Sequence, residues 1–147
     1  MTATQVKEIA PVIAPGYGVT EALQAGVFLT KASVTINKSS TSPVELFRVP
    51  KNTMVHDLIL QVGTAFDGTG TPSITLGDSD DVDRFMDNTA AAPATAGNKS
   101  MKQDTQPGSG GYVYTADGLI TATFAAGSSS AGEAKVYMLY SNRVDKL

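Results

Sequence analysis

The 147-residue sequence contains no cysteine and no tryptophan, and it has only one histidine. Without cysteine the chain can form neither disulfide bonds nor thiolate metal sites. Charged side chains are also sparse, at 17% of the residues, and they sum to a formal net charge of −3. A weakly acidic protein has no long-range positive field to attract a polyanion. We therefore expect no nucleic-acid partner.

Long apolar runs are missing as well. No segment approaches the roughly 20 consecutive apolar residues that a membrane-spanning helix needs. Near the N-terminus the apolar residues Ile9, Val12 and Ile13 are interrupted by Pro11, whereas a secretion signal requires an unbroken apolar stretch of about 7–15 residues. These absences predict a protein with no membrane partner, which acts in solution or as part of a soluble assembly.

Threonine, serine, alanine and glycine dominate the sequence, and in several segments apolar side chains recur at every second position. This alternation is typical of strands with one buried face. The length fits one domain of roughly 100–150 residues. We predict a single all-β domain over residues 27–147, an antiparallel β-sandwich of jelly-roll-like type. The expected strands are residues 27–36, 44–49, 53–66, 72–77, 112–116, 118–126 and 133–141.

Two connections in this domain carry their own predictions. The Asp117-Gly118 pair is a turn signal, and it predicts a hairpin between the two strands that flank it. Residues 87–111 are polar, small and aperiodic, which predicts a long loop that holds one short strand near residues 99–103. Loops of such length are usually functional or mobile.

Residues 1–26 predict an extended N-terminal arm outside the sandwich. Pro11, Pro15, Gly16 and Gly18 prevent a regular helix or strand there. Apolar side chains in the arm have no local core to bury them, so we predict that they contact another protein subunit; a solvated tail is the alternative. The predicted contact residues are Val6, Ile9, Val12, Ile13 and Tyr17.

Catalytic machinery is hard to place in this sequence. A Ser–His–acid triad would have to use His56, the sole histidine, which the alternation places in mid-strand on an apolar face with Met54 and Leu58. The neighbouring Asp57 points to the opposite face, because side chains alternate along a strand. We interpret His56 as a hydrogen-bonded strand residue, and we predict no catalytic residue and no enzymatic activity.

An acidic run opens the segment of residues 78–86. Hard cations prefer several oxygen ligands, which alternating carboxylates in a tight loop can supply. The run lacks the glycine and the final glutamate of an EF-hand loop. We therefore predict one helical turn capped by Asp78 or Ser79, with acids at its positive end, and we expect neither a metal nor another cofactor. The acids of this run are Asp78, Asp80, Asp81 and Asp83.

Three tyrosines are the candidates for a carbohydrate site, which needs exposed aromatic platforms. Tyr112 and Tyr114 share one face of a predicted strand, and Tyr137 lies on another. Cross-strand tyrosines also serve packing. Both interpretations apply to this sequence, with packing as the favoured one.

The order of several segments between Val27 and Ser141 resembles small virion proteins of tailed bacteriophages, of the head decoration or cement type. The resemblance covers about three-quarters of the chain and rests on order and style rather than on an invariant motif. The segments that carry it are Pro50-Lys51-Asn52, Thr-Ala-Phe-Asp-Gly at 64–68, Ile-Thr-Leu-Gly at 74–77, Asp81-Val82-Asp83-Arg84-Phe85, and Gly-Glu-Ala-Lys-Val-Tyr-Met-Leu-Tyr at 132–140.

The resemblance implies a non-enzymatic structural protein, made in the cytoplasm of a host bacterium and located on the capsid surface of the virion. Its implied partners are the shell of the major capsid protein and further copies of the chain, as a trimer or dimer. It implies no binding residues, since no family motif places them. The alternative function is a tail or fibre module that recognises host glycans through residues 67–72 and 87–111.

Overall fold

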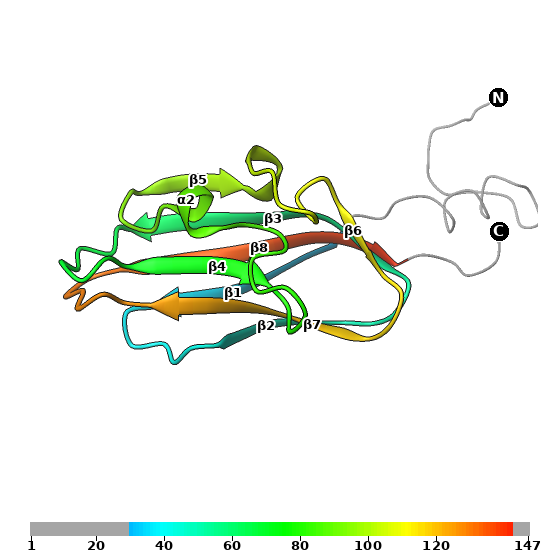
Figure 1. Ribbon diagram of the computed structural model, residues 1–147, viewed down its shortest axis with the longest axis horizontal. Helices are drawn as coiled ribbons and strands as arrows, with labels where there is room; N and C mark the ends of the chain where they lie inside the picture. The colour runs from blue at the N-terminus through cyan, green and yellow to red at the C-terminus, as the bar shows by residue number, and fades with distance from the viewer. Residues whose placement is uncertain (1–29, 143–147) are drawn as a thin grey trace, which may run out of the picture.

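The computed structural model describes residues 30–142, and it contains eight β-strands with two short helical turns (Figure 1). None of the helices in this part of the chain is long and apolar enough to cross a membrane. The strands are β1 (Thr30–Asn37), β2 (Val44–Val49), β3 (Thr53–Thr64), β4 (Ser73–Gly77), β5 (Gly97–Ser100), β6 (Tyr112–Tyr114), β7 (Gly118–Ala125) and β8 (Glu133–Asn142). The helical turns are α2 (Asn88–Ala91) and the 3-10 turn η2 (Met101–Gln103).

The strands form two antiparallel sheets. The larger sheet has the order β1-β8-β3-β5, and β6 pairs with the beginning of β3 on the same edge as β5. The smaller sheet has the order β2-β7-β4. Side chains from the inner faces of both sheets interdigitate between them, as in other β-sandwiches. The predicted all-β sandwich is therefore confirmed, whereas jelly-roll connectivity and the domain boundary at residue 27 stay predictions.

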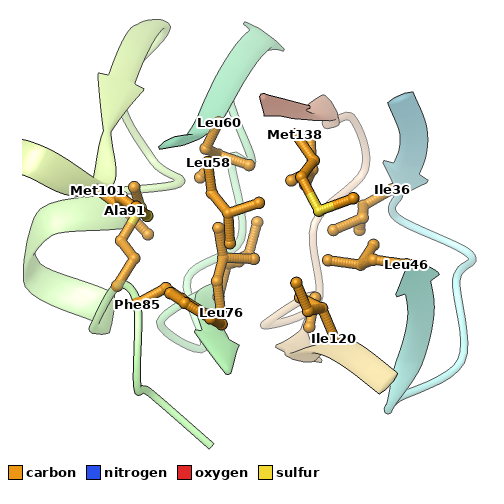
Figure 2. Close-up of a cluster of buried hydrophobic side chains, with 14 of the residues drawn as sticks. Ile36, Leu46, Leu58, Leu60, Leu76, Phe85, Ala91, Met101, Ile120 and Met138 are labelled. Atoms are coloured by element: carbon orange, nitrogen blue, oxygen red, sulfur yellow. The ribbon is translucent and has the colours of Figure 1, made fainter. Parts of the chain in front are cut away.

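One apolar core fills the space between the sheets (Figure 2). Leu58 and Leu60 of β3 face Leu76 of β4 in its middle, and all three are fully buried. Phe85 and Met101, from the segment between β4 and β6, close the core on the β5 side. Burying one large apolar side chain contributes about 1.5–3 kcal/mol. The 87–111 segment is thus part of the folded body, because it supplies Met101 and Ala91 to the core.

The alternation of side chains along β3 reverses at His56, and a second register shift follows near the end of the strand, between Val62 and Thr64. The pairing of β3 with β8 shifts register between Val55 and Asp57, which leaves His56 as the extra residue of a β-bulge. Val55 faces the core before the bulge and Leu58 after it, whereas Met54 and His56 are only half-buried. The prediction that Met54, His56 and Leu58 share one face is wrong, since one inserted residue exchanges the two faces.

The predicted hairpin at Asp117-Gly118 is also wrong. Strand β6 pairs with β3 in the larger sheet, whereas β7 pairs with β2 and β4 in the smaller one, so the chain crosses between the sheets at this point. The Tyr114 ring lies against Gly118, where an added Cβ would be 2.5 Å from the ring carbon Cε1. The chain bends at residues 115–116, but the strands on either side of this bend belong to different sheets.

Residues 78–86 form turns and no helix. The Asp78 carboxylate accepts the backbone N–H groups of Asp80 and Asp81, both at 3.1 Å, and so closes a tight turn instead of capping a helix. A β-bridge between Leu76 and Met86 then ends the segment. The helical turn comes later, as α2, where the Asp87 side chain accepts the N–H of Ala90 at 2.8 Å. The carboxylate that caps this helical turn belongs to Asp87, which lies nine residues after Asp78, the predicted cap.

Candidate functional site

The five predicted contact residues of the N-terminal arm lie outside the described part of the chain: Val6, Ile9, Val12, Ile13 and Tyr17. The described part of the chain begins with β1. Thr30, the first described residue of β1, is paired with Tyr140 near the end of β8. The start of β1 and the end of β8 therefore lie at the same end of the sandwich, opposite the turns that follow β1, β3 and β7 (Figure 1).

The outward face of the larger sheet presents apolar and polar side chains together. Tyr137 of β8 is paired with Ile59 of β3, and both side chains are half-buried. Leu139 follows Tyr137 on the same face of β8. Lys135 precedes Tyr137 on that face, and it is paired with Gln61 of β3. The Tyr137 hydroxyl is 3.4 Å from the Gln61 side-chain oxygen. A surface of this composition is suited to packing against another protein.

At the end of the sandwich away from Thr30, Asp67 joins two loops. Its carboxylate accepts the backbone N–H groups of Ser130 and Ala131 at 2.8 and 3.0 Å, and the Ser130 hydroxyl at 2.7 Å. These bonds, led by the N–H of Ala131, hold the pKa of Asp67 below its usual value. The backbone N–H of Gly68 also donates a hydrogen bond to the Ser129 hydroxyl, at 2.8 Å. Sequence reasoning missed these bonds between the two loops. The sequence signals there are only an Asp-Gly turn and, far along the chain, a serine-rich turn.

Next to these bonds, the loops 67–72 and 87–111 come together. They surround a shallow hollow of about 380 Å³. Its lining combines small residues of the first loop with Asn88 and residues 92–95 of the second, and none of these side chains is aromatic or charged. The Asn88 oxygen is already engaged, because it accepts the N–H of Ile74 at 2.9 Å. The hollow thus offers polar groups for a small ligand but no stacking platform.

Two of the three candidate tyrosines, Tyr112 and Tyr114, pack inside the fold. Tyr112 and Tyr114 do share a face of β6, but this face points into the sandwich. Their rings meet edge to face with centroids 5.0 Å apart, and Tyr112 packs in the same way on Phe85 at 5.9 Å. The Arg84 guanidinium lies 4.5 Å from the centre of the Tyr112 ring. Only Tyr137 lies on an outer face, so the three residues do not form one platform.

Asp78 is the centre of a hydrogen-bonded cluster. Arg84 Nε lies 2.7 Å from its Oδ2, and the Tyr114 hydroxyl donates to the same oxygen at 2.9 Å. Burial would raise the pKa of Asp78, but the bonds from Arg84 and Tyr114 outweigh burial and lower it. Burial raises the pKa of Tyr114 strongly, and its bond to Asp78 adds to this. Within residues 30–142 no three His, Cys, Asp or Glu side chains form a group that could hold a metal ion.

A catalytic triad is not assembled around His56. Its ring nitrogen Nε2 lies 2.8 Å from the hydroxyl of Ser141, which is itself buried. The carboxylate of Asp57 instead accepts the hydroxyl of Ser100, at 2.8 and 2.9 Å to its two oxygens. No carboxylate of the described residues is hydrogen-bonded to the His56 ring to orient it, as a triad would require. The arrangement ties β3 to β8 through Ser141 and to β5 through Ser100.

Comparison with protein families and with curated proteins gave no match for this chain. Solved structures do match, and they come from phage capsids. One chain of the acidic stable capsid structure of Helicobacter pylori bacteriophage KHP30 aligns with a TM-score of 0.62 and 18% identity, over 79% of this chain and 89% of that chain.

Two further capsid structures align over more of the sequence. A chain of the cyanophage Pam1 capsid asymmetric unit gives a TM-score of 0.59 and 20% identity, over 97% of this chain and 99% of that chain. A chain of the Ralstonia phage GP4 capsid gives 0.55 and 14%, over 94% of this chain and 93% of that chain. The fold of this protein is therefore shared with chains of three phage capsids.

Proposed function

We propose that this chain is a non-enzymatic structural virion protein, which binds the assembled capsid shell of a phage and stabilises it as a decoration or cement protein. The observation that carries this proposal is the shared fold with chains from three phage capsid structures, over 79–97% of this chain. The residue chemistry agrees with it, since the only histidine and the buried acid are committed to internal hydrogen bonds.

The proposed mechanism is thermodynamic linkage. A protein that binds the assembled shell and not its separated subunits stabilises the shell by mass action. The partners in this proposal are the major capsid protein and further copies of this chain, as a trimer or dimer, without nucleic acid or membrane. The protein is made in the host cytoplasm and resides on the capsid surface.

Two surfaces are the proposed contacts. The first is the N-terminal arm, with Val6, Ile9, Val12, Ile13 and Tyr17. The second is the outward face of the larger sheet, where Tyr137, Ile59 and Leu139 present apolar area between polar neighbours. The arm would contribute apolar contacts, and the sheet face would supply area without rearrangement.

Binding to shells that lack this protein tests the proposal. Replacing the five apolar arm residues by serine is expected to abolish co-sedimentation with the shells, because the arm loses its buried area. A matched control replaces five polar residues of the same arm by serine, namely Thr2, Thr4, Gln5, Lys7 and Glu8, and is expected to bind normally. Full binding by the apolar-to-serine variant would remove the arm from the interface. If the unaltered protein does not bind shells, the decoration function is wrong.

Copy number in purified virions separates this function from the alternative one. A decoration protein is expected at a copy number that approaches that of the major shell subunit. A handful of copies would instead indicate a tail or fibre component, and the alternative proposal, glycan recognition, would take first place.

The hollow between loops 67–72 and 87–111 is the observation that favours the alternative function. If the protein recognises glycans through this hollow, it is expected to bind them equally well when residues 1–18 are removed. It is expected to lose glycan binding when Thr69→Arg or Ala94→Arg fills the hollow. A glycan array with the intact protein, the shortened protein and these two variants measures this directly.

A further inference from the structure

An apolar groove opens between the two sheets at the end where β1 begins. It has a volume of about 370 Å³. Strands β1 and β8 form one wall and β2 forms the other, with Pro50 at the end and Arg48 and Thr53 as the polar residues of the lining. The apolar side chains that line it are Ala32, Leu46, Phe47, Val49, Met138 and Tyr140.

Burial decreases toward this groove along both strands of its first wall. On the inner face of β1, Ile36 is fully buried, whereas Val34 and Ala32, nearer the groove, are only half-buried. On β8, Val136 is fully buried but Tyr140 is half-buried. The core is therefore complete at one end of these strands and uncovered at the other.

The pairing of β1 with β8 identifies which residue would cover this end. The register places Thr30 opposite Tyr140. Two residues earlier the sequence has Phe28, which would be opposite Asn142 if the same register continued. Because side chains alternate along a strand, Phe28 has the same inward parity as Ala32, Val34 and Ile36. We propose that this groove is the docking site of Phe28 of the same chain, which extends β1 and closes the sandwich.

Size and connection favour this occupant over a side chain from elsewhere. An aromatic side chain buries roughly 150–250 Å², and the groove offers apolar walls on both sides. Phe28 is only two residues from Thr30, so its docking loses little chain entropy compared with a distant segment. Tyr17, the other aromatic residue of the first 29, lies 13 residues before Thr30, so its docking would have to order a longer segment of the chain. Docking of Phe28 fixes the point at which the arm leaves the sandwich, and it requires no shell.

The absence of tryptophan makes this proposal directly measurable. In the full-length protein, F28W introduces a single tryptophan at the docking position, and Y17W introduces one in the arm as the matched control. The F28W fluorescence is expected to be shifted to shorter wavelength than that of Y17W, with a quenching constant for iodide that is severalfold lower. Equal spectra and equal quenching for the two variants would overturn the proposal.

Filling the groove provides the second arm of the test. In the F28W background, Ala32→Phe is expected to make the fluorophore as accessible to iodide as in Y17W. If that double variant does not fold, thermal unfolding of Phe28→Ser and Tyr17→Ser replaces it, with a lowered midpoint expected only for Phe28→Ser. Protection of F28W that appears only as protein concentration rises would show docking into a second copy, and would contradict docking within one chain. Since the isolated protein is used throughout, a failure here leaves shell binding untouched.

Discussion

The buried carboxylate of Asp78 shapes the segment that leaves β4. Its two oxygens receive two backbone N–H groups, the Arg84 guanidinium and the Tyr114 hydroxyl. Hydrogen bonds to an ionised partner are shorter and stronger than neutral ones. The cluster therefore links the turn after β4 to β6 of the other sheet, and it explains why the acidic run folds inward at its first residue.

Removing the phenol oxygen isolates one bond of this cluster. Tyr114→Phe is expected to lower the free energy of unfolding by about 1.5–3 kcal/mol, because the buried carboxylate loses a donor. The matched control is Tyr137→Phe on the outer face, where the expected change is within about 0.5 kcal/mol. Urea denaturation of both variants gives the comparison. Equal effects of the two substitutions would show that the Tyr114 bond to Asp78 contributes no special stability.

Asp83 and Asp78 have opposite effects on stability as pH changes. A hydrogen bond with the Asp81 carboxyl, with burial and the charge of Asp81, raises the pKa of Asp83. The folded state then binds this proton more tightly than the unfolded state, so stability falls as pH rises from about 3.9, the ordinary aspartate value, through the raised pKa. For Asp78 the lowered pKa gives a stabilising contribution that is complete above about pH 3.9 and is lost as pH falls through the lowered value.

Asp83→Asn is accordingly expected to raise the free energy of unfolding at pH 7 and to have no such benefit at pH 3, where the carboxyl is protonated in both states. Urea denaturation at the two pH values measures this. Asp80→Asn removes the same charge from the same run at an exposed position and serves as the control. A gain for Asp83→Asn that is as large at pH 3 would contradict the role of its ionisation.

At the scale of elements, the sequence predicted what depends on local alternation. The strands β2, β4, β7 and β8 lie where the period of two places them, and in β7 every second residue, namely Ile120, Ala122 and Phe124, is buried in the core. The sequence could not predict what depends on contacts between distant segments. The bulge at His56 is a mismatch between two strands, so no pattern within β3 alone encodes it.

The same distinction applies to the candidate site. Sequence patterns singled out Asp78 and Tyr114 separately, one as a helix cap and the other as a carbohydrate platform. Neither pattern predicts that they bond to each other across 36 residues, which the structure shows. The arm residues remain predictions, since they lie outside residues 30–142. Local chemistry thus identified Asp78 and Tyr114, and tertiary packing assigned their roles.

The loops around Asp67 approach closely enough to forbid a side chain at Gly68. An added Cβ there would lie 2.0 Å from the Gly127 carbonyl oxygen. Gly68→Ala is expected to destabilise the protein by about 1–3 kcal/mol, because the backbone of one loop must move. Gly110→Ala is the matched control, since an added Cβ meets nothing within 4 Å, and the expected result is little change or a gain of about 0.4–1 kcal/mol. Equal midpoints in chemical denaturation would show that the loops adjust freely.

At the scale of the whole molecule, both sheets share one core. Residues from β1, β3 and β8 contact those from β2, β4 and β7 in a single cluster, and the 87–111 segment adds Met101 to it. Neither sheet has a second apolar layer of its own among the described residues. The sandwich should therefore lose both sheets together when it unfolds.

Coincident unfolding curves test this expectation. Far-ultraviolet circular dichroism follows the strands, and tyrosine fluorescence follows side chains such as Tyr112 and Tyr114 inside the fold. The two signals are expected to give the same midpoint in urea, as a two-state transition requires. An early fluorescence change with intact strands would mean that the 78–114 region opens by itself and that the core is not one cooperative unit.

The placement of Thr30 and Asn142 at one end of the sandwich gives the molecule a direction. The exposed turn around Ser39 lies at the other end, where the chain passes from β1 to β2. A foreign peptide inserted there would project away from the end at which the arm is attached. If the arm holds the protein to a particle, such an insertion would be displayed outward, and the protein could carry antigens or enzymes on a shell without modifying the shell subunit itself.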